Sequence, residues 1–105
     1  MSADFVKVAE TKDILPSNMK AVDIQGGERI CIANVEGKYY AIGNVCTHLG
    51  GPLNEGTLER YEVECPWHGS KFDVRTGEPT KPPARQAVPK YEIKVEENNL
   101  LVRKQ

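Results

Sequence analysis

The chain has 105 residues, 39% of them hydrophobic and 28% charged, a composition that favours one globular domain and excludes an intrinsically disordered chain. Its 14 basic and 15 acidic residues give a formal net charge of −1, which excludes the strong positive field typical of nucleic-acid-binding proteins. We therefore expect a single domain over residues 1–105 with no nucleic-acid partner.

The first twenty residues indicate neither export nor membrane insertion. Charged residues break up the apolar runs there, namely Asp4, Lys7, Glu10, Lys12 and Asp13, so the apolar core of a signal peptide is missing. No run approaches the roughly 18 to 20 apolar residues that a membrane-spanning helix requires. These features predict a soluble protein with no membrane partner.

The first clear structural signal is a β-hairpin. Residues 29–35 and 38–42 have strand composition, and the two residues between them, Glu36-Gly37, place glycine second in a tight turn. The two segments should pair as antiparallel strands. Cys31 lies in the middle of the first, and we expect it to be a small buried core residue without a function of its own.

The middle of the chain, from Asn44 to about Ser70, has a different character. It contains the sequences His48-Leu49-Gly50-Gly51-Pro52 and Cys65-Pro66-Trp67-His68-Gly69, in which glycine and proline replace strand-like alternation. Such a segment predicts tight loops inserted into a rigid β scaffold, where binding chemistry usually resides. Further along, Pro82 and Pro83 predict an extended surface loop, because neither can donate a backbone hydrogen bond.

A second hairpin is predicted near the C-terminus. Tyr91, Ile93 and Val95 alternate with charged residues, and Asn98-Asn99 then turns the chain into a return strand over residues 100–103. Helical periodicity is weak throughout the sequence. The expected fold class is therefore all-β.

The chain has only two histidines, and each lies close to a cysteine. Cys46-Thr47-His48 is followed, after sixteen residues, by Cys65-Pro66-Trp67-His68. Each half offers one thiolate and one imidazole from a loop with glycine just beyond it, which suits two loops closing around one inorganic centre. With an odd total of three cysteines, this pairing favours metal ligation in a reducing compartment over a disulfide framework, so we expect a cytoplasmic protein.

This pattern resembles the Rieske family, whose motif is Cys-x-His, a spacer and Cys-x-x-His. The resemblance implies an antiparallel β-sandwich with an inserted two-loop subdomain, over about residues 44–70, that binds one 2Fe-2S cluster. It also implies that Cys46 and Cys65 bind one iron, and His48 and His68 the other. Replacing two thiolates by neutral imidazoles raises the cluster's formal charge from about −2 to zero, which explains why Rieske centres accept electrons more readily than four-cysteine clusters.

The resemblance also implies residues that surround the cluster. Proteins of this family with high potentials carry a loop disulfide, but Gly51 and Trp67 stand at its positions here. Ser70 matches a hydroxyl that donates a hydrogen bond to cluster sulfur, whereas Phe72 replaces the tyrosine that donates another. We therefore expect a midpoint potential in the lower half of the range from about −150 to +300 mV. The surrounding residues implied are Leu49, Gly50, Trp67, Gly69, Ser70, Phe72, Pro82 and Pro83.

Three functions follow from these residues. The first is a single-electron carrier, a Rieske ferredoxin that is not itself an enzyme and passes electrons from a reductase to an oxygenase or another acceptor. The second is the small subunit of an assimilatory nitrite reductase, which shares the fold. The third is a structural zinc module, since zinc accepts two cysteines and two histidines, although the single residue between Cys46 and His48 is shorter than the usual zinc-finger spacing.

Overall fold

The computed structural model describes residues 5–24, 28–47, 50–67 and 69–104. In these residues it contains two antiparallel β-sheets, two short 3-10 helices, η1 (Thr11–Asp13) and η2 (Leu53–Glu55), and no α-helix, which confirms the all-β prediction. No helix in the described ranges is long and apolar enough to cross a membrane.

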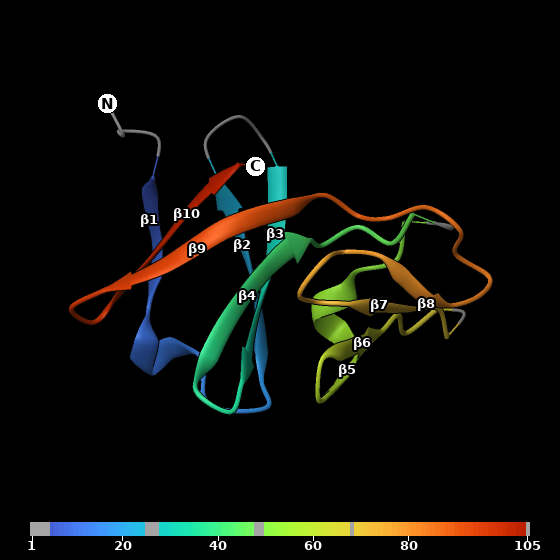
Figure 1. Ribbon diagram of the computed structural model, residues 1–105, viewed down its shortest axis with the longest axis horizontal. Helices are drawn as coiled ribbons and strands as arrows, with labels where there is room; N and C mark the ends of the chain where they lie inside the picture. Colours follow the sequence, from blue (N-terminus) through green and yellow to red (C-terminus); the bar gives the residue numbers. More distant parts are fainter. Residues whose placement is uncertain (1–4, 25–27, 48–49, 68, 105) are drawn as a thin grey trace.

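The larger sheet has six strands in the order β1-β10-β9-β4-β3-β2 and lies to the left in Figure 1. Its strands are β1 (Val6–Glu10), β2 (Met19–Ile24), β3 (Glu28–Val35), β4 (Lys38–Gly43), β9 (Lys90–Glu96) and β10 (Asn99–Lys104). The smaller sheet, to the right, has the order β5-β6-β7-β8. It consists of β5 (Thr57–Glu59), β6 (Glu62–Glu64), β7 (Lys71–Asp73) and β8 (Pro79–Lys81).

The β3–β4 hairpin forms as its sequence predicts. Val35 pairs with Lys38, and the turn residues Glu36 and Gly37 have φ values of 56° and 92°. Positive φ at both central positions matches the right-handed twist of the flanking strands, and glycine adopts it without steric cost. The Asn34 side chain accepts a hydrogen bond from the Gly37 backbone N–H, at 2.8 Å, and so holds the turn closed.

The C-terminal hairpin also forms, but its turn lies one residue earlier than predicted. Asn99 already pairs with Glu96, so the turn residues are Glu97 and Asn98, and Glu97 has a φ of 59°. The apolar face of β9 is buried only at its start, since Tyr91 is 3% exposed and Val95 is 49% exposed. Alternation in the sequence predicts which face of the sheet a side chain lies on. It does not predict how far along the strand that face is covered by other residues.

Strand β3 is buried on both faces because it lies between two cores. Ile30 and Ile32 point into the core of the six-stranded sheet, together with Ala41 and Leu100. The alternating residues of β3, among them Cys31, point into a second core shared with the smaller sheet. Cys31 is fully buried, as predicted.

The middle segment is more regular than a set of loops. It contains η2, β5 and β6, and the small sheet continues beyond Ser70 to the end of β8 at Lys81. These three-residue strands are too short to show clear alternation in the sequence. Pairing along the sheet, for example of Val63 with Phe72, supplies the order that the sequence pattern did not reveal.

Candidate metal centre

The first cysteine loop, residues 46–51, follows β4 at the junction between the two sheets. Val45 and Pro52 form an antiparallel bridge at its base. The Cys46 N–H donates to the Gly51 carbonyl at 2.9 Å, and the Gly50 N–H donates to the Cys46 carbonyl at 2.9 Å. Gly50 has a φ of 82°, a conformation that glycine adopts readily, so the loop can reverse tightly behind the cysteine.

The second cysteine loop, residues 65–70, repeats this backbone pattern after β6. The Cys65 N–H donates to the Ser70 carbonyl at 2.7 Å, and the Gly69 N–H donates to the Cys65 carbonyl at 3.1 Å. Gly69 has a φ of 78°. In each loop the cysteine is followed four residues later by a glycine with positive φ, and five residues later by the residue whose carbonyl accepts from the cysteine N–H.

The two loops face each other at very short range. A Cβ added to Gly51 would lie 2.7 Å from the Cys65 sulfur, closer than real Cβ contacts allow, so only glycine lets the first loop approach that thiol. Cys46 and Cys65 are each 3% exposed and belong to the same core, which also contains Phe72. None of the three cysteines, all of which lie in the described residues, forms a disulfide.

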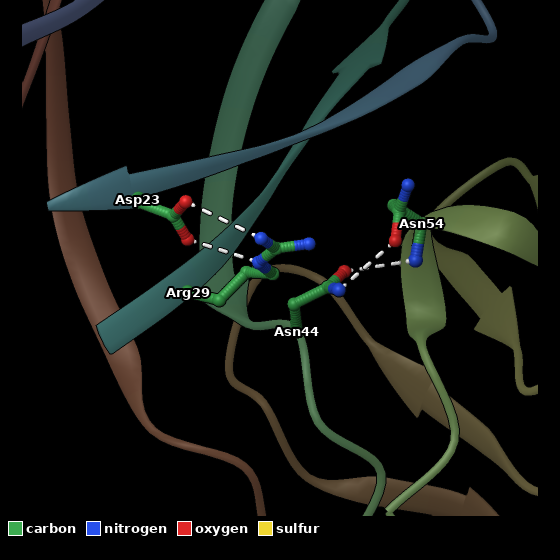
Figure 2. Close-up of polar contacts among 4 residues, drawn as sticks. All are labelled: Asp23, Arg29, Asn44 and Asn54. Carbon is green, nitrogen blue, oxygen red and sulfur yellow. Dashed lines mark hydrogen bonds and ion pairs between the residues drawn. The ribbon is translucent and has the colours of Figure 1, made fainter. Parts of the chain in front are cut away.

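A buried asparagine anchors the base of the first cysteine loop to the short helix η2. Asn44 is 2% exposed; its amide nitrogen donates to Oδ1 of Asn54 at 2.9 Å, and its Oδ1 accepts from the Asn54 backbone N–H at 2.8 Å (Figure 2). The Asn44 backbone N–H also donates to the Arg29 carbonyl, and its carbonyl accepts from the Leu53 N–H. One residue thus ties β3, η2 and the cysteine loop together.

Figure 2 also shows an ion pair between Arg29 on β3 and Asp23 on β2, with a shortest distance of 2.9 Å. The two residues are direct neighbours across the strands and lie on the exposed surface. An exposed pair of this kind contributes little to stability, about 0 to 1 kcal/mol. The Asn44–Asn54 contact is the more important one for the candidate site because it is shielded from water and lies two residues before Cys46.

The proline loop, residues 82–89, is hydrogen-bonded to both cysteine loops. The Thr47 hydroxyl donates to the Gln86 carbonyl at 2.7 Å, and the Ala84 N–H donates to Oγ of the fully buried Ser70 at 3.0 Å. Pro82 and Pro83 are exposed, as expected for a surface loop. Because Ser70 Oγ accepts from Ala84, the hydroxyl hydrogen is left to be donated to another group.

The structure brings together most of the predicted site residues that it describes. Cys46, Cys65 and Ser70 are buried and Phe72 packs in the core that contains both cysteines, whereas Trp67 is 55% exposed. His48, Leu49 and His68 lie outside the described residues. Among the described residues, His, Cys, Asp and Glu form no group of three or more that could hold a metal.

Sequence reasoning did not identify Asn44 and Thr47 as part of the site. Both are polar residues within two positions of Cys46, and asparagine at the end of a strand was the available signal. A pattern of this kind cannot show that the amide pairs with Asn54 or that the hydroxyl reaches Gln86, because those partners are ten and 39 residues away in sequence.

The donor set suits an iron-sulfur centre. Two buried thiols stand on loops of matching backbone geometry, and the missing side chain of Gly51 leaves the Cys65 sulfur accessible to the first loop. Thiolates are the ligands that iron-sulfur clusters require. Full burial raises the pKa of the Cys31 thiol to about 12, which keeps it protonated and unreactive.

An all-β fold in which two thiol-bearing loops close on each other defines a class of protein built to hold an inorganic centre. The Rieske [2Fe-2S] domain family matches residues 4–92, so the chain belongs to this family. Membership of this family confirms the prediction of one Rieske-type 2Fe-2S cluster and favours it over a structural zinc ion.

Similar sequences include ferredoxins over their full length. The chain is 33% identical over 102 residues to the ferredoxin component of the naphthalene 1,2-dioxygenase system of Pseudomonas putida, covering 97% of both proteins. It is also 33% identical over 96 residues to apoptosis-inducing factor 3 of Homo sapiens, which covers 91% of this chain but only 16% of that protein. The prediction of an electron-transfer protein is thus confirmed at the level of the protein class.

Solved structures give the same result for the fold. The ferredoxin of carbazole 1,9a-dioxygenase from Nocardioides aromaticivorans IC177 matches with a TM-score of 0.93 at 32% identity, covering 98% of this chain and all of that one. A chain in the complex of reduced oxygenase and oxidized ferredoxin in carbazole 1,9a-dioxygenase matches with a TM-score of 0.91 at 32% identity, covering 97% and 96%. A nitrite reductase small subunit from Mycobacterium tuberculosis, at 20% identity and a TM-score of 0.86, shares the fold alone.

Proposed function

We propose that this chain is the ferredoxin of a multicomponent redox system, accepting one electron from a reductase and delivering it to a terminal oxygenase. The observation that carries this proposal is the match along 97% of both chains to the ferredoxin component of a dioxygenase system. When bound, a Rieske cluster supplies one reversible electron at a moderate potential.

We further propose that Cys46 and Cys65 hold one iron and that His48 and His68 hold the other. In support, both thiols are buried, matching backbone hydrogen bonds position them, and no disulfide consumes them. The chain itself contributes rigidity: Asn44 fixes the base of the first loop and Ser70 ties the second to the proline loop. Rigid loops keep the environment of the centre nearly unchanged between its two oxidation states.

The protein environment should place the midpoint potential in the lower half of the Rieske range. Ser70 can donate its hydroxyl hydrogen toward cluster sulfur, since Oγ already accepts from Ala84. Phe72 has no hydroxyl and is fully buried, so it offers no second donor. Fewer hydrogen bonds to sulfur stabilise the electron-richer reduced state less. A redox titration with a midpoint above about +150 mV would contradict this proposal.

We place the protein in the cytoplasm and its partner contact at the end of the molecule that carries the two cysteine loops. Cysteines without disulfides fit a reducing compartment. The contact is placed there because electron transfer weakens with distance from the centre.

Absorption and reduced-state electron paramagnetic resonance spectra of the purified chain test the function. We expect a red-brown protein whose reduced spectrum has the low average g value of mixed histidine and cysteine ligation. A colourless protein containing one zinc ion per chain would overturn the electron carrier and support the structural module instead. Co-purification with a sirohaem-containing partner would instead assign the chain to a nitrite reductase.

A further inference from the structure

The proline loop is buried at only two of its residues. Ala84 and Val88 are 5% and 2% exposed and belong to the same core as Cys46 and Cys65. The three residues between them, 85–87, are all exposed. The chain therefore leaves the cysteine core, crosses the surface and returns to that core. We call residues 85–87 the strap.

Buried backbone contacts hold both ends of the strap. The Ala84 N–H donates to Oγ of the fully buried Ser70, and the Val88 N–H donates to the carbonyl of buried Gly77 at 2.9 Å. A Cβ added to Gly77 would lie 2.4 Å from the Val88 carbonyl oxygen, so the backbone is closely packed at this end. Ala84 and Val88 are thus fixed points between which the strap is suspended.

The middle of the strap is held much more weakly than its ends. Within the described ranges, one hydrogen bond joins it to the rest of the protein, from the Thr47 hydroxyl to the Gln86 carbonyl at 2.7 Å. This bond is exposed to solvent, and a shallow depression lined by Thr47, Pro83, Arg85 and Gln86 borders it. Water can take the place of an exposed partner at little cost, whereas a buried group that loses its partner stays unsatisfied.

The candidate metal centre needs a segment that can open. Cys46 and Cys65 are each 3% exposed, so iron held by these thiols cannot leave while every neighbouring segment stays in place. Native proteins open locally where buried contacts are few and backbone groups are exposed. Val63 and Phe72 of the same core are fully buried on paired strands, whereas the strap is exposed along its whole length.

We propose that the strap opens and closes beside the first cysteine loop, that the Thr47–Gln86 hydrogen bond holds it closed, and that its opening sets how fast iron leaves the folded protein. This inference rests on the proposed cluster site and adds a conformational step that controls the lifetime of the cluster. Opening breaks one exposed hydrogen bond and moves three residues about fixed ends. It therefore requires far less free energy than unfolding of the domain.

Transfer of iron from the oxidised holoprotein to excess EDTA, without oxygen, measures this opening. Ferric iron passes to EDTA, its bonds to Cys46 and Cys65 break, both thiolates and the cluster sulfides take up protons, and no electron is transferred. The decay of visible absorption gives the rate. If opening precedes loss, the rate should reach a plateau as the EDTA concentration rises. A rate that rises in proportion to the EDTA concentration, without a plateau, would overturn the proposal.

Substitutions of Thr47 test the bond that holds the strap closed. Thr47→Val keeps the shape of the side chain but removes the hydroxyl, and should raise the plateau rate about two- to tenfold. Thr47→Ser keeps a hydroxyl and should restore the rate to within about twofold of wild type. Thr57→Val, the same substitution at an exposed position of β5, is the matched control and should leave the rate unchanged. Equal rates in Thr47→Val and Thr57→Val would contradict a role for the hydroxyl in holding the strap.

A further variant loosens the strap without changing a residue next to a candidate ligand. Gln86→Gly/Ala87→Gly keeps the Gln86 carbonyl but gives the open strap more backbone freedom, and should raise the plateau rate about three- to tenfold. The reduced-state electron paramagnetic resonance spectrum should match that of wild type, because no ligand changes. An unchanged rate in this variant would show that iron leaves by another route and would overturn the strap.

Backbone hydrogen exchange reports the opening independently of iron loss. In the holoprotein, Thr47→Val and Gln86→Gly/Ala87→Gly should both exchange faster than wild type over residues 84–88 and at the wild-type rate over β6. Faster iron loss without faster exchange over residues 84–88 would assign the effect of Thr47 to the neighbouring ligands and overturn the strap. A purified wild-type protein without iron and sulfide would instead overturn the electron carrier, and this proposal with it.

Discussion

The two cysteine loops share the same pattern of backbone hydrogen bonds but have different anchors. In each, the cysteine N–H bonds a carbonyl five residues ahead and the cysteine carbonyl accepts from a glycine four residues ahead. The first loop ends in Gly51, which lies against the Cys65 sulfur, and its Thr47 reaches the proline loop. The second ends in buried Ser70, which binds the proline loop through its own side chain. Backbone geometry therefore places the thiols, and the side chains decide how each loop is held.

Loss of either thiol should have the largest effect on this pair of loops. Cys46→Ala and Cys65→Ala should each abolish cluster binding, because the two loops present one thiolate apiece. Cys31→Ala is the matched control, since that thiol is buried in the same core and remains protonated. Iron content and visible absorption measure the result. A full cluster in Cys65→Ala would show that the loops do not act as a pair.

The anchor of the first loop is the next most sensitive point. Asn44→Ala removes two hydrogen bonds and leaves polar groups of Asn54 without partners, which should lower the free energy of unfolding by about 2 to 3 kcal/mol and speed cluster loss. Urea unfolding and the decay of visible absorption measure the two effects.

Asn44→Asp is the conservative control for this anchor. The carboxylate accepts from the Asn54 backbone, and a rotated Asn54 amide can donate to its second oxygen, so the contact should survive. No loss of stability or cluster in Asn44→Ala would show that the Asn44 hydrogen bonds do not hold the loop.

The close approach of the loops can be tested at Gly51. Gly51→Ala should cost about 1 to 3 kcal/mol of stability and part of the cluster, because its Cβ would lie 2.7 Å from the Cys65 sulfur. Gly37→Ala is the control: it has a φ of 92° but open space around it, so it should cost about 1 kcal/mol through the backbone and leave the cluster intact. A full cluster in Gly51→Ala would mean that the loops can separate without loss.

The anchor of the second loop should affect the potential more than stability. Ser70→Ala removes a hydroxyl that can donate toward the cluster, and one hydrogen bond lost from the reduced state lowers a one-electron midpoint by about 20 to 65 mV. Protein-film voltammetry measures the shift, with urea unfolding run in parallel because the contact with Ala84 is also lost. An unchanged midpoint would assign Ser70 to holding the proline loop only.

The smallest expected effect is on stability and comes from Asp73, a carboxylate outside the cysteine loops. The hydrogen bond from Arg75 lowers the pKa of Asp73, so the folded protein holds this carboxylate more tightly ionised than the unfolded chain. Its stabilisation, below about 1 kcal/mol for this partly exposed pair, is present above pH 4 and disappears as the pH falls through the folded pKa. Asp73→Asn should therefore be less stable than wild type at pH 7, and this difference should shrink as the pH falls below about 4. A difference that does not change with pH would exclude the ion pair as its cause.

Local sequence was enough to predict the β3–β4 hairpin and the candidate cysteines. Glu36-Gly37 predicted the position of the hairpin turn because glycine adopts positive φ readily. The short spacing of Cys46 and Cys65 from the two histidines identified them as candidate ligands. The short strands β5 to β8 were not predicted, because three residues are too few to show a period. The turn before β10 was misplaced by one residue because the neighbouring asparagines are equally suited to it.

The sequence by itself determined the class of centre, because a thiolate and an imidazole in each of two glycine-bounded segments suit few other ligands. Only the tertiary structure decided how the loops are held and what lies beside them. The hydrogen-bond partners of Asn44, Thr47 and Ser70 come from other segments of the chain and become visible only when every neighbour is placed. Ligand identity is a local chemical property, whereas hydrogen-bond partners and surface charge depend on which segments the fold brings together.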